Sequence, residues 1–253
     1  MIRFLTSLFL ILPLIALAEP TVTKNDGPVR ILFLGHESKH HNSNAYYPIL
    51  AKALGHDAIQ FDYHTSVESA LGDPKYLSRF DGVMLYANHE SAEDHQYQNL
   101  LNFIENGGAF LPVHCACGCI KNQEGFTPLV GGEFASHKHG VFNTSIIKPD
   151  HPAMKDVIEF EAWDETYVHK NHAPDRTILM VRKPAGKDDN ITKPEPWTWV
   201  RNQGKGRVFY TASGHDERVW KHPGFHQLLK SGILWAIGDE RLATYQRYMS
   251  TKK

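Results

Sequence analysis

Short apolar runs alternate with helical patterns along the first half of the chain. Runs rich in β-branched and aromatic residues, most of them ending in glycine or a polar loop, predict strands at residues 29–34, 58–63, 81–86 and 109–113. Apolar residues at three- and four-residue spacing predict helices at residues 44–54, 76–80 and 92–106. This alternation is typical of a parallel sheet that is covered by helices on both faces. We therefore predict a three-layer α/β fold, flavodoxin-like and doubly wound.

The second half of the chain is less regular, and strands dominate it. Apolar segments predict strands at residues 141–147, 160–168, 177–181, 197–201 and 207–212. Residues 224–238 carry an apolar helical face and predict a closing helix, whereas residues 183–196, rich in Pro, Asp and Lys, predict a surface loop. We expect some of these strands to add antiparallel pairs to the mostly parallel sheet or to form a lid.

The first eighteen residues have the pattern of a secretory signal peptide. Arg3 precedes an apolar run over residues 4–16, and the small residues Ala16 and Ala18 fit a signal-peptidase site. The run is short for a bilayer span, and polar residues follow it. We expect cleavage after Ala18, which would leave one domain over residues 19–253 in the periplasm or outside the cell, with no membrane association.

Composition narrows the classes of partner. The chain has 27 Lys and Arg against 28 Asp and Glu, a formal net charge of −1, and no basic cluster. The electrostatic signature of a nucleic-acid binder is therefore missing, and a small-molecule partner is expected. The sequence does not indicate an oligomeric state. The unusual feature is the histidine content, 16 residues in 253.

Many of these histidines follow predicted strands directly. The segments after the first, third, fourth and last strands of the predicted parallel set contain, in order, His36 with His40 and His41, then His89, His114 and His215. In a doubly wound sheet, ligands bind outside the carboxyl ends of the strands, so these loops are expected to meet at one rim. Histidine transfers protons near neutral pH and also binds metals, so the pattern supports either chemistry.

Several segments together resemble the trehalose-utilisation (ThuA-like) family. They are Gly35-His36, the run from Gly107 to Cys115, the run from Gly131 to His137, Trp163 to His169, Pro196 to Arg201, and Gly204 to Trp220. The resemblance covers nearly the whole expected mature chain and is most specific in the Asp-Glu-Thr-Tyr-Val-His and Gly-His-Asp segments. It implies a fold similar to class I glutamine amidotransferases and a link to trehalose and related glucosides through their 3-keto derivatives.

Strand ends and family-like segments together give the candidate site. The candidate catalytic residues are His36, His114 and His215, which follow strands, and Glu165, which is chosen on the resemblance alone. The candidate substrate-binding residues are His41, His137, Tyr167, His169, Arg201 and Arg218. Trp197 and Trp199 share one strand face and fit either a sugar-stacking surface or the core.

A metal is a second interpretation of the same histidines. The side chains of His36, His114, His137 and His215, with Glu165, offer the donors that zinc or a similar divalent ion accepts. No short motif such as His-Glu-x-x-His defines the geometry, so the sequence leaves a metal cofactor open.

Three function hypotheses follow. The leading one is an isomerase, lyase or hydrolase that moves a proton next to the carbonyl of a keto-sugar. The second is a sugar-binding module without catalysis. The third is an amidase or hydrolase with a Cys115, His215 and Glu217 triad at the positions used by glutamine amidotransferases. The glycine pattern of their nucleophile turn is absent around Cys115, so we expect this thiol to be dispensable or only partly important.

Overall fold

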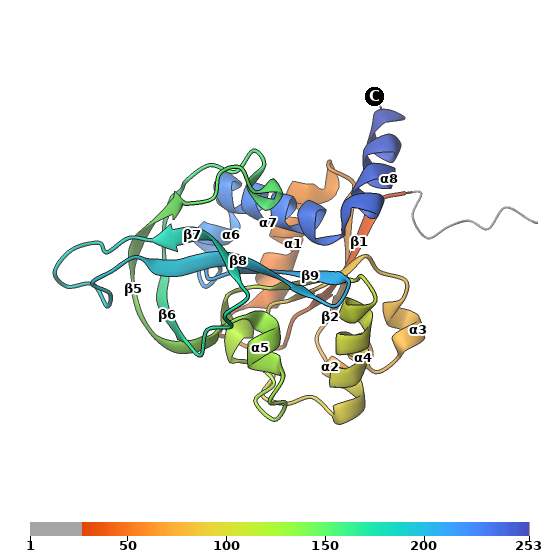
Figure 1. The fold of residues 1–253 in the computed structure, drawn as a ribbon, viewed down its shortest axis with the longest axis horizontal. Coiled ribbons are helices and arrows are strands. Elements are labelled where there is room, and N and C mark those ends of the chain that lie inside the picture. Colours follow the sequence, from red (N-terminus) through yellow and green to blue (C-terminus); the bar gives the residue numbers. More distant parts are fainter. Residues whose placement is uncertain (1–26, 253) are drawn as a thin grey trace, which may run out of the picture.

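A nine-stranded sheet with helices on both faces forms the centre of the molecule (Figure 1). The computed structural model describes residues 27–252, so the predicted signal peptide lies outside the described residues. The strand order is β2-β1-β3-β4-β9-β8-β7-β5-β6. The predicted three-layer α/β architecture with a mostly parallel part and an antiparallel extension is confirmed.

The parallel part consists of β2 (Ile59–His64), β1 (Val29–Leu34), β3 (Gly82–Leu85), β4 (Ala109–Pro112) and β9 (Gly206–Thr211). The middle strands β1, β3 and β4 are almost entirely buried because helices cover both of their faces. This burial explains why they appear in the sequence as continuous apolar runs and not as alternating ones.

Four strands form the antiparallel extension. They are β5 (Glu133–Ile146), β6 (Glu161–Lys170), β7 (Thr177–Arg182) and β8 (Glu195–Gln203). The strand β8 pairs with β9 on one side and β7 on the other, and β5 joins β7 to β6. Trp197 and Trp199 on β8 are fully buried, so the structure assigns both to the core.

Helices cover the two faces of the sheet in separate groups. In Figure 1, α1 (Ser43–Gly55), α6 (Glu217–Trp220) and α7 (Pro223–Ala236) lie on one side, and α2 (Val67–Leu71), α4 (Asp94–Glu105) and α5 (Phe126–Val130) lie on the other. Shorter or terminal elements complete the chain: α3 (Pro74–Leu77), the 3-10 turns η1 (His114–Gly118) and η2 (Pro152–Met154), and α8 (Asp239–Ser250). Asn42 begins α1 by accepting a hydrogen bond from the backbone N–H of Ala45.

The structure corrects the predicted elements in two places. The helices α2, α5, α6 and α8 were not predicted, because the first three are single turns and α8 buries few residues. The strand β5 begins at Glu133, eight residues before the predicted start at Val141. Its first half is polar and mostly exposed on both faces, so only pairing with β6 reveals it as a strand.

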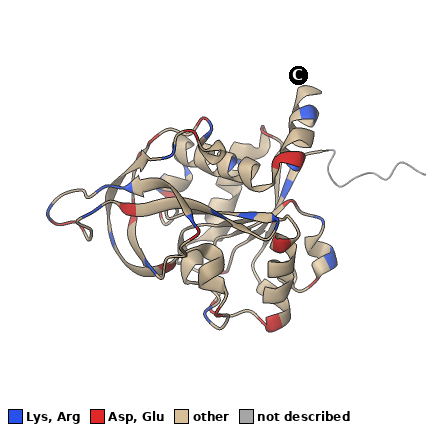
Figure 2. Cartoon of the chain, viewed as in Figure 1, with Lys and Arg blue, Asp and Glu red and all other residues tan. Residues whose placement is uncertain are grey.

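Charged residues are spread over helices, strands and loops, and neither sign gathers on one element in the view of Figure 2. Within residues 27–252, no helix is long and apolar enough to cross a membrane.

Candidate functional site

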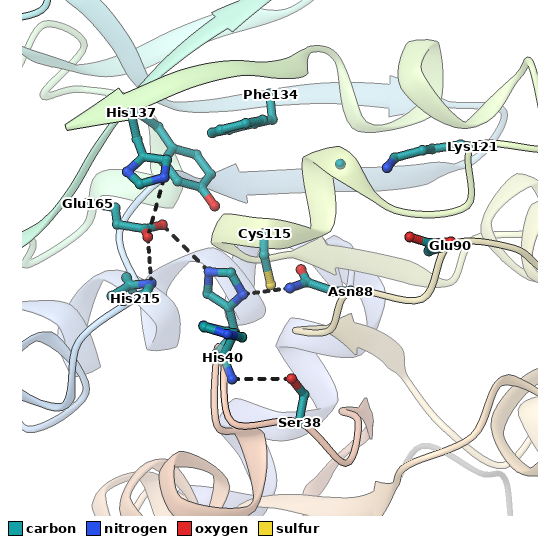
Figure 3. Close-up of a pocket in the computed structure, with 13 residues that line it drawn as sticks. Ser38, His40, Asn88, Glu90, Cys115, Lys121, Phe134, His137, Glu165 and His215 are labelled. Carbon is teal, nitrogen blue, oxygen red and sulfur yellow. Dashed lines mark hydrogen bonds and ion pairs between the residues drawn. The ribbon is translucent and has the colours of Figure 1, made fainter. Parts of the chain in front are cut away.

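A cavity of about 450 Å³ lies at the carboxyl edge of the parallel strands, and Glu165 lines it. Glu165 belongs to β6 and stands opposite His139 of β5, and Tyr167 stands opposite His137. The paired strands β5 and β6 thus bring a carboxylate, a phenol and two imidazoles to the carboxyl edge of the sheet. The loops that follow β1, β3, β4 and β9 begin at this edge. Figure 3 shows Glu165 between His137 on one side and His215 on the other.

Five imidazoles face the Glu165 carboxylate. Oε2 lies 3.2 Å from Nε2 of His114 and 3.6 Å from Nε2 of His41. Oε1 lies 3.2 Å from Nδ1 of His215, and it is 3.4 Å from Nε2 of His139 and 3.6 Å from Nε2 of His137. We call these six residues the Glu165 cluster: His41, His114, His137, His139, Glu165 and His215.

Unusual backbone conformations direct two of these rings. His41 has φ 53° just before α1, and His114 has φ 50° in the turn after β4. Left-handed backbone is uncommon for residues other than glycine, and such strain concentrates at functional sites. Gly214 has φ 142°, and a Cβ added there would come within 3.1 Å of His114 Cβ, so only glycine allows this approach.

Asp164 positions the loop that carries His215. Its buried carboxylate accepts the backbone N–H groups of Gly214 at 2.8 Å, His215 at 2.9 Å and Asp216 at 3.0 Å. Because Asp164 and Glu165 are neighbours on β6, one side chain holds the loop while the next faces the imidazole that the loop presents. The alternation of a β-strand produces this division of roles.

Burial and charge act in opposite directions on the site groups. Burial lowers the pKa of His114 to about 3, against the opposing effect of Glu165. Burial also lowers the pKa of His41. For His215, burial is outweighed by the nearby carboxylate of Glu165, and the pKa is raised. Burial would raise the pKa of Glu165, but the surrounding imidazoles together hold it far below its usual range.

Aromatic rings form one wall and part of the rim. Tyr167 stacks on His114 with ring centroids 4.0 Å apart, and Phe134 lies 4.7 Å from Tyr167. Burial raises the pKa of Tyr167 well above its ordinary value, so its hydroxyl keeps the proton. Trp163 stacks on His139 on one face, and the Arg218 guanidinium lies 4.2 Å from its ring centroid.

The structure brings together His114, Glu165 and His215 of the four candidate catalytic residues. His36 lies at the same edge, but its Nε2 donates to the carbonyl of His41 and its Nδ1 accepts from the backbone N–H of Asn88. The ring of His36 therefore supports the loop, and the ring of His41 faces the carboxylate in its place.

The candidate substrate-binding residues are divided. His41, His137 and Tyr167 line the cavity, and Arg218 lies beyond it on Trp163. His169 is in the core, between Glu195 and the Tyr210 hydroxyl. Arg201 pairs with Asp175 and donates to the carbonyl of Leu129, and it does not line the cavity.

The geometry around Cys115 differs from a nucleophile turn. The left-handed residue after β4 is His114, and Cys115 Sγ donates to the carbonyl of Ala87 at 3.2 Å. Burial raises the pKa of this thiol well above its ordinary value, which disfavours a thiolate. Glu217 pairs with Lys221 on the surface of α6, whereas His215 faces Glu165. Cys115, Cys117 and Cys119 are all buried free thiols.

His139 and Asp164 were not among the candidates. His139 could have been found from its spacing, since His137 and His139 are two residues apart and share a face once residues 133–140 are known to be a strand. Asp164 lies in the same family-like segment as Glu165, but no spacing indicated its role, because its hydrogen bonds join residues about fifty positions apart in the sequence.

Two groups in the described chain have the spacing of metal ligands. One is His41, His114, Glu165 and His215, and the other is His137, His139 and Glu165. Within each group the donor atoms lie within 4.8 Å of one another. The candidate ligand His36 belongs to neither group, for the reason given above.

The parallel order β2-β1-β3-β4, with the site at the carboxyl edge and a strained turn after β4, defines a flavodoxin-like α/β protein with a histidine–carboxylate site. The chain belongs to the ThuA family, described as trehalose utilisation, whose model matches residues 30–236. The resemblance noted from the sequence is therefore confirmed.

Solved structures share the fold at low sequence identity. A protein from Parabacteroides merdae described as ThuA-like is 19% identical, with a TM-score of 0.71, over 83% of this chain and 90% of that one. One from Bacteroides uniformis, also described as ThuA-like, is 18% identical, with a TM-score of 0.70, over 83% and 91%. A β-galactosidase from Bacillus circulans is 16% identical, with a TM-score of 0.59, over 83% of this chain and 31% of the enzyme. A comparison with curated proteins found no match.

Proposed function

We propose that this protein is an enzyme of carbohydrate metabolism that acts on a trehalose-type sugar or a 3-keto-glucoside by proton transfer at the Glu165 cluster. One observation carries the proposal: five imidazoles surround a single carboxylate at a cavity. Such an arrangement suits acid/base chemistry, because histidine exchanges protons near neutral pH.

The cavity suits a sugar in size and lining. A volume of about 450 Å³ falls within the range of small-molecule pockets, roughly 300–1,000 Å³. Phe134 and Tyr167 offer apolar ring surface, and Asn88, Glu90 and Lys121 offer polar groups for hydroxyls. The family description, trehalose utilisation, agrees with this class of ligand.

The chemistry assigns different roles to the residues of the Glu165 cluster and to Tyr167 beside it. A 3-keto group acidifies the neighbouring C–H, so isomerisation or elimination needs a base and a donor for the enolate oxygen. Glu165 is a poor base, since its pKa is held far below its usual range. His137 and His139 are the more exposed imidazoles and accept the proton, while Tyr167 keeps its own proton and donates to the oxygen.

NMR of products tests this proposal. The purified protein is incubated with 3-keto-trehalose and 3-keto-glucose, and the double variant His137→Gln, His139→Gln is compared with His95→Gln, which changes an exposed histidine on α4. We expect turnover to fall by about two to four orders of magnitude in the double variant and to be unchanged in the control. Saturable binding without turnover would favour a sugar-binding module instead.

Export is a further part of the proposal. Residues 1–18 have the signal-peptide pattern, and we propose cleavage after Ala18 and a periplasmic or secreted protein with a small-molecule sugar as its partner. Mass spectrometry of the protein from its native host should find Glu19 at the N-terminus. An intact Met1 would contradict export by this route.

A further inference from the structure

Four donor atoms of the Glu165 cluster are spaced as a coordination shell. One donor atom from each of His41, His114, Glu165 and His215 lies within 4.8 Å of the others. Glu165 Oε2 is 3.6 Å from His41 Nε2 and 3.2 Å from His114 Nε2, and Oε1 is 3.2 Å from His215 Nδ1. Around a tetrahedral zinc ion with bonds of about 2.0–2.1 Å, neighbouring ligands are about 3.4 Å apart. We propose that these four side chains bind one divalent transition-metal ion of the zinc type.

The hydrogen bonds of His114 leave a lone pair directed at the carboxylate. Its Nδ1 lies 2.6 Å from the carbonyl oxygen of Ala212, which can only accept, so Nδ1 carries the proton. In the neutral ring, the Nε2 lone pair then faces Glu165 Oε2 at 3.2 Å. Two lone pairs repel at this distance, whereas a cation between them is attracted by both. A backbone carbonyl on the far nitrogen is a common partner of a metal-binding histidine.

The other two rings have unpartnered nitrogens at the same point. His41 Nε2 and His215 Nδ1 are buried and have no hydrogen-bond partner, and only two other side-chain atoms within residues 27–252 share this state. A buried polar atom without a partner is costly, so the cluster is incomplete as a set of hydrogen bonds. An ion held by these two nitrogens completes it.

The second nitrogen of His41 lies beside an amide that can serve as the partner of a metal-binding histidine. Asn88 Nδ2 lies 2.8 Å from His41 Nδ1; the flipped amide, which occupies the same space, places its oxygen there to accept the Nδ1 proton. His41 Nε2 is then free for the ion.

The donor set selects the class of ion. Three imidazole nitrogens and one carboxylate suit zinc and neighbouring first-row ions, whereas magnesium and calcium prefer oxygen ligands. His137 and His139 are more exposed, and His137 lines the cavity. An ion here would polarise the carbonyl of a keto-sugar. That catalytic use rests on the proposed function, but binding of the ion does not.

Calorimetry with zinc tests the site. The protein, purified without a polyhistidine tag and stripped with chelator, is titrated with zinc chloride, and metal content is measured after dialysis. We expect one ion per chain. His41→Gln and His215→Gln should each lower the affinity by at least about 10–100-fold, and His95→Gln should leave it unchanged. Failure to retain zinc, or equal affinity in all variants, would overturn the site.

A second measurement uses the unmodified protein, so its result does not depend on whether the variants fold. X-ray absorption of the zinc-loaded protein should show nitrogen and oxygen neighbours at about 2.0–2.1 Å with the scattering of imidazole rings. A spectrum without imidazole scattering would overturn the assignment.

Zinc binding without keto-sugar turnover supports this site and counts against the proposed function. Turnover by a chelated protein that binds no zinc refutes this site and leaves the proposed function standing.

Discussion

Acid should destabilise the metal-free protein through His114. The ring is fully buried, and its pKa in the folded protein is lowered from 6.5 to about 3, chiefly by burial. In the unfolded chain the ring is exposed and takes up a proton below its ordinary pKa. As the pH falls below that value, the unfolded state therefore binds a proton that the folded state does not bind. The free energy of unfolding decreases as a result.

The size of this effect follows from the pKa difference. Each pH unit between the two pKa values changes the free energy of unfolding by about 1.4 kcal/mol for one proton. Lowering the pH from 6.5 to 5 should therefore remove about 2 kcal/mol through His114 alone. The loss should continue until the pH approaches the folded pKa of about 3.

Denaturant titrations at several pH values measure this contribution. They are performed with chelator on the unmodified protein, on His114→Asn and on the exposed-site control His95→Asn. Asparagine tolerates the left-handed backbone at position 114 and keeps a side-chain donor for the Ala212 carbonyl. The pH dependence of stability should be weaker by about one proton in His114→Asn and unchanged in the control. The same slope in all three proteins would refute the reasoning, whatever their absolute stabilities.

Three further substitutions probe the site. Glu165→Gln should lower the pKa of His215, because the carboxylate that outweighs burial is lost, and an NMR titration of the ring measures it. Gly214→Ala should cost roughly 1–3 kcal/mol in thermal or denaturant unfolding, because alanine is strained at φ 142° and its methyl group would crowd His114. Cys115→Ser should retain substantial turnover, since the thiol is buried and protonated; abolished turnover with intact fold and binding would restore the cysteine-nucleophile hypothesis.

The local pattern of apolar and polar residues was sufficient to predict most of the fold. The buried parallel strands are continuous apolar runs, and β1 has the bounds that its run of residues predicts. The strand-end rule also placed the loops of His41, His114 and His215 at one edge, because parallel strands send all their carboxyl ends to the same side. Glu165 was found through the family resemblance.

Only the tertiary structure decided which histidines face Glu165. The polar first half of β5 has no apolar alternation of its own, and its pairing with β6 is what brings His139 opposite Glu165. Whether His36 or His41 turns toward the carboxylate depends on hydrogen bonds to Asn88 and on left-handed backbone, neither of which leaves a periodic signal. Sequence periodicity records which face of an element is buried, whereas a site depends on the directions of side chains from distant elements.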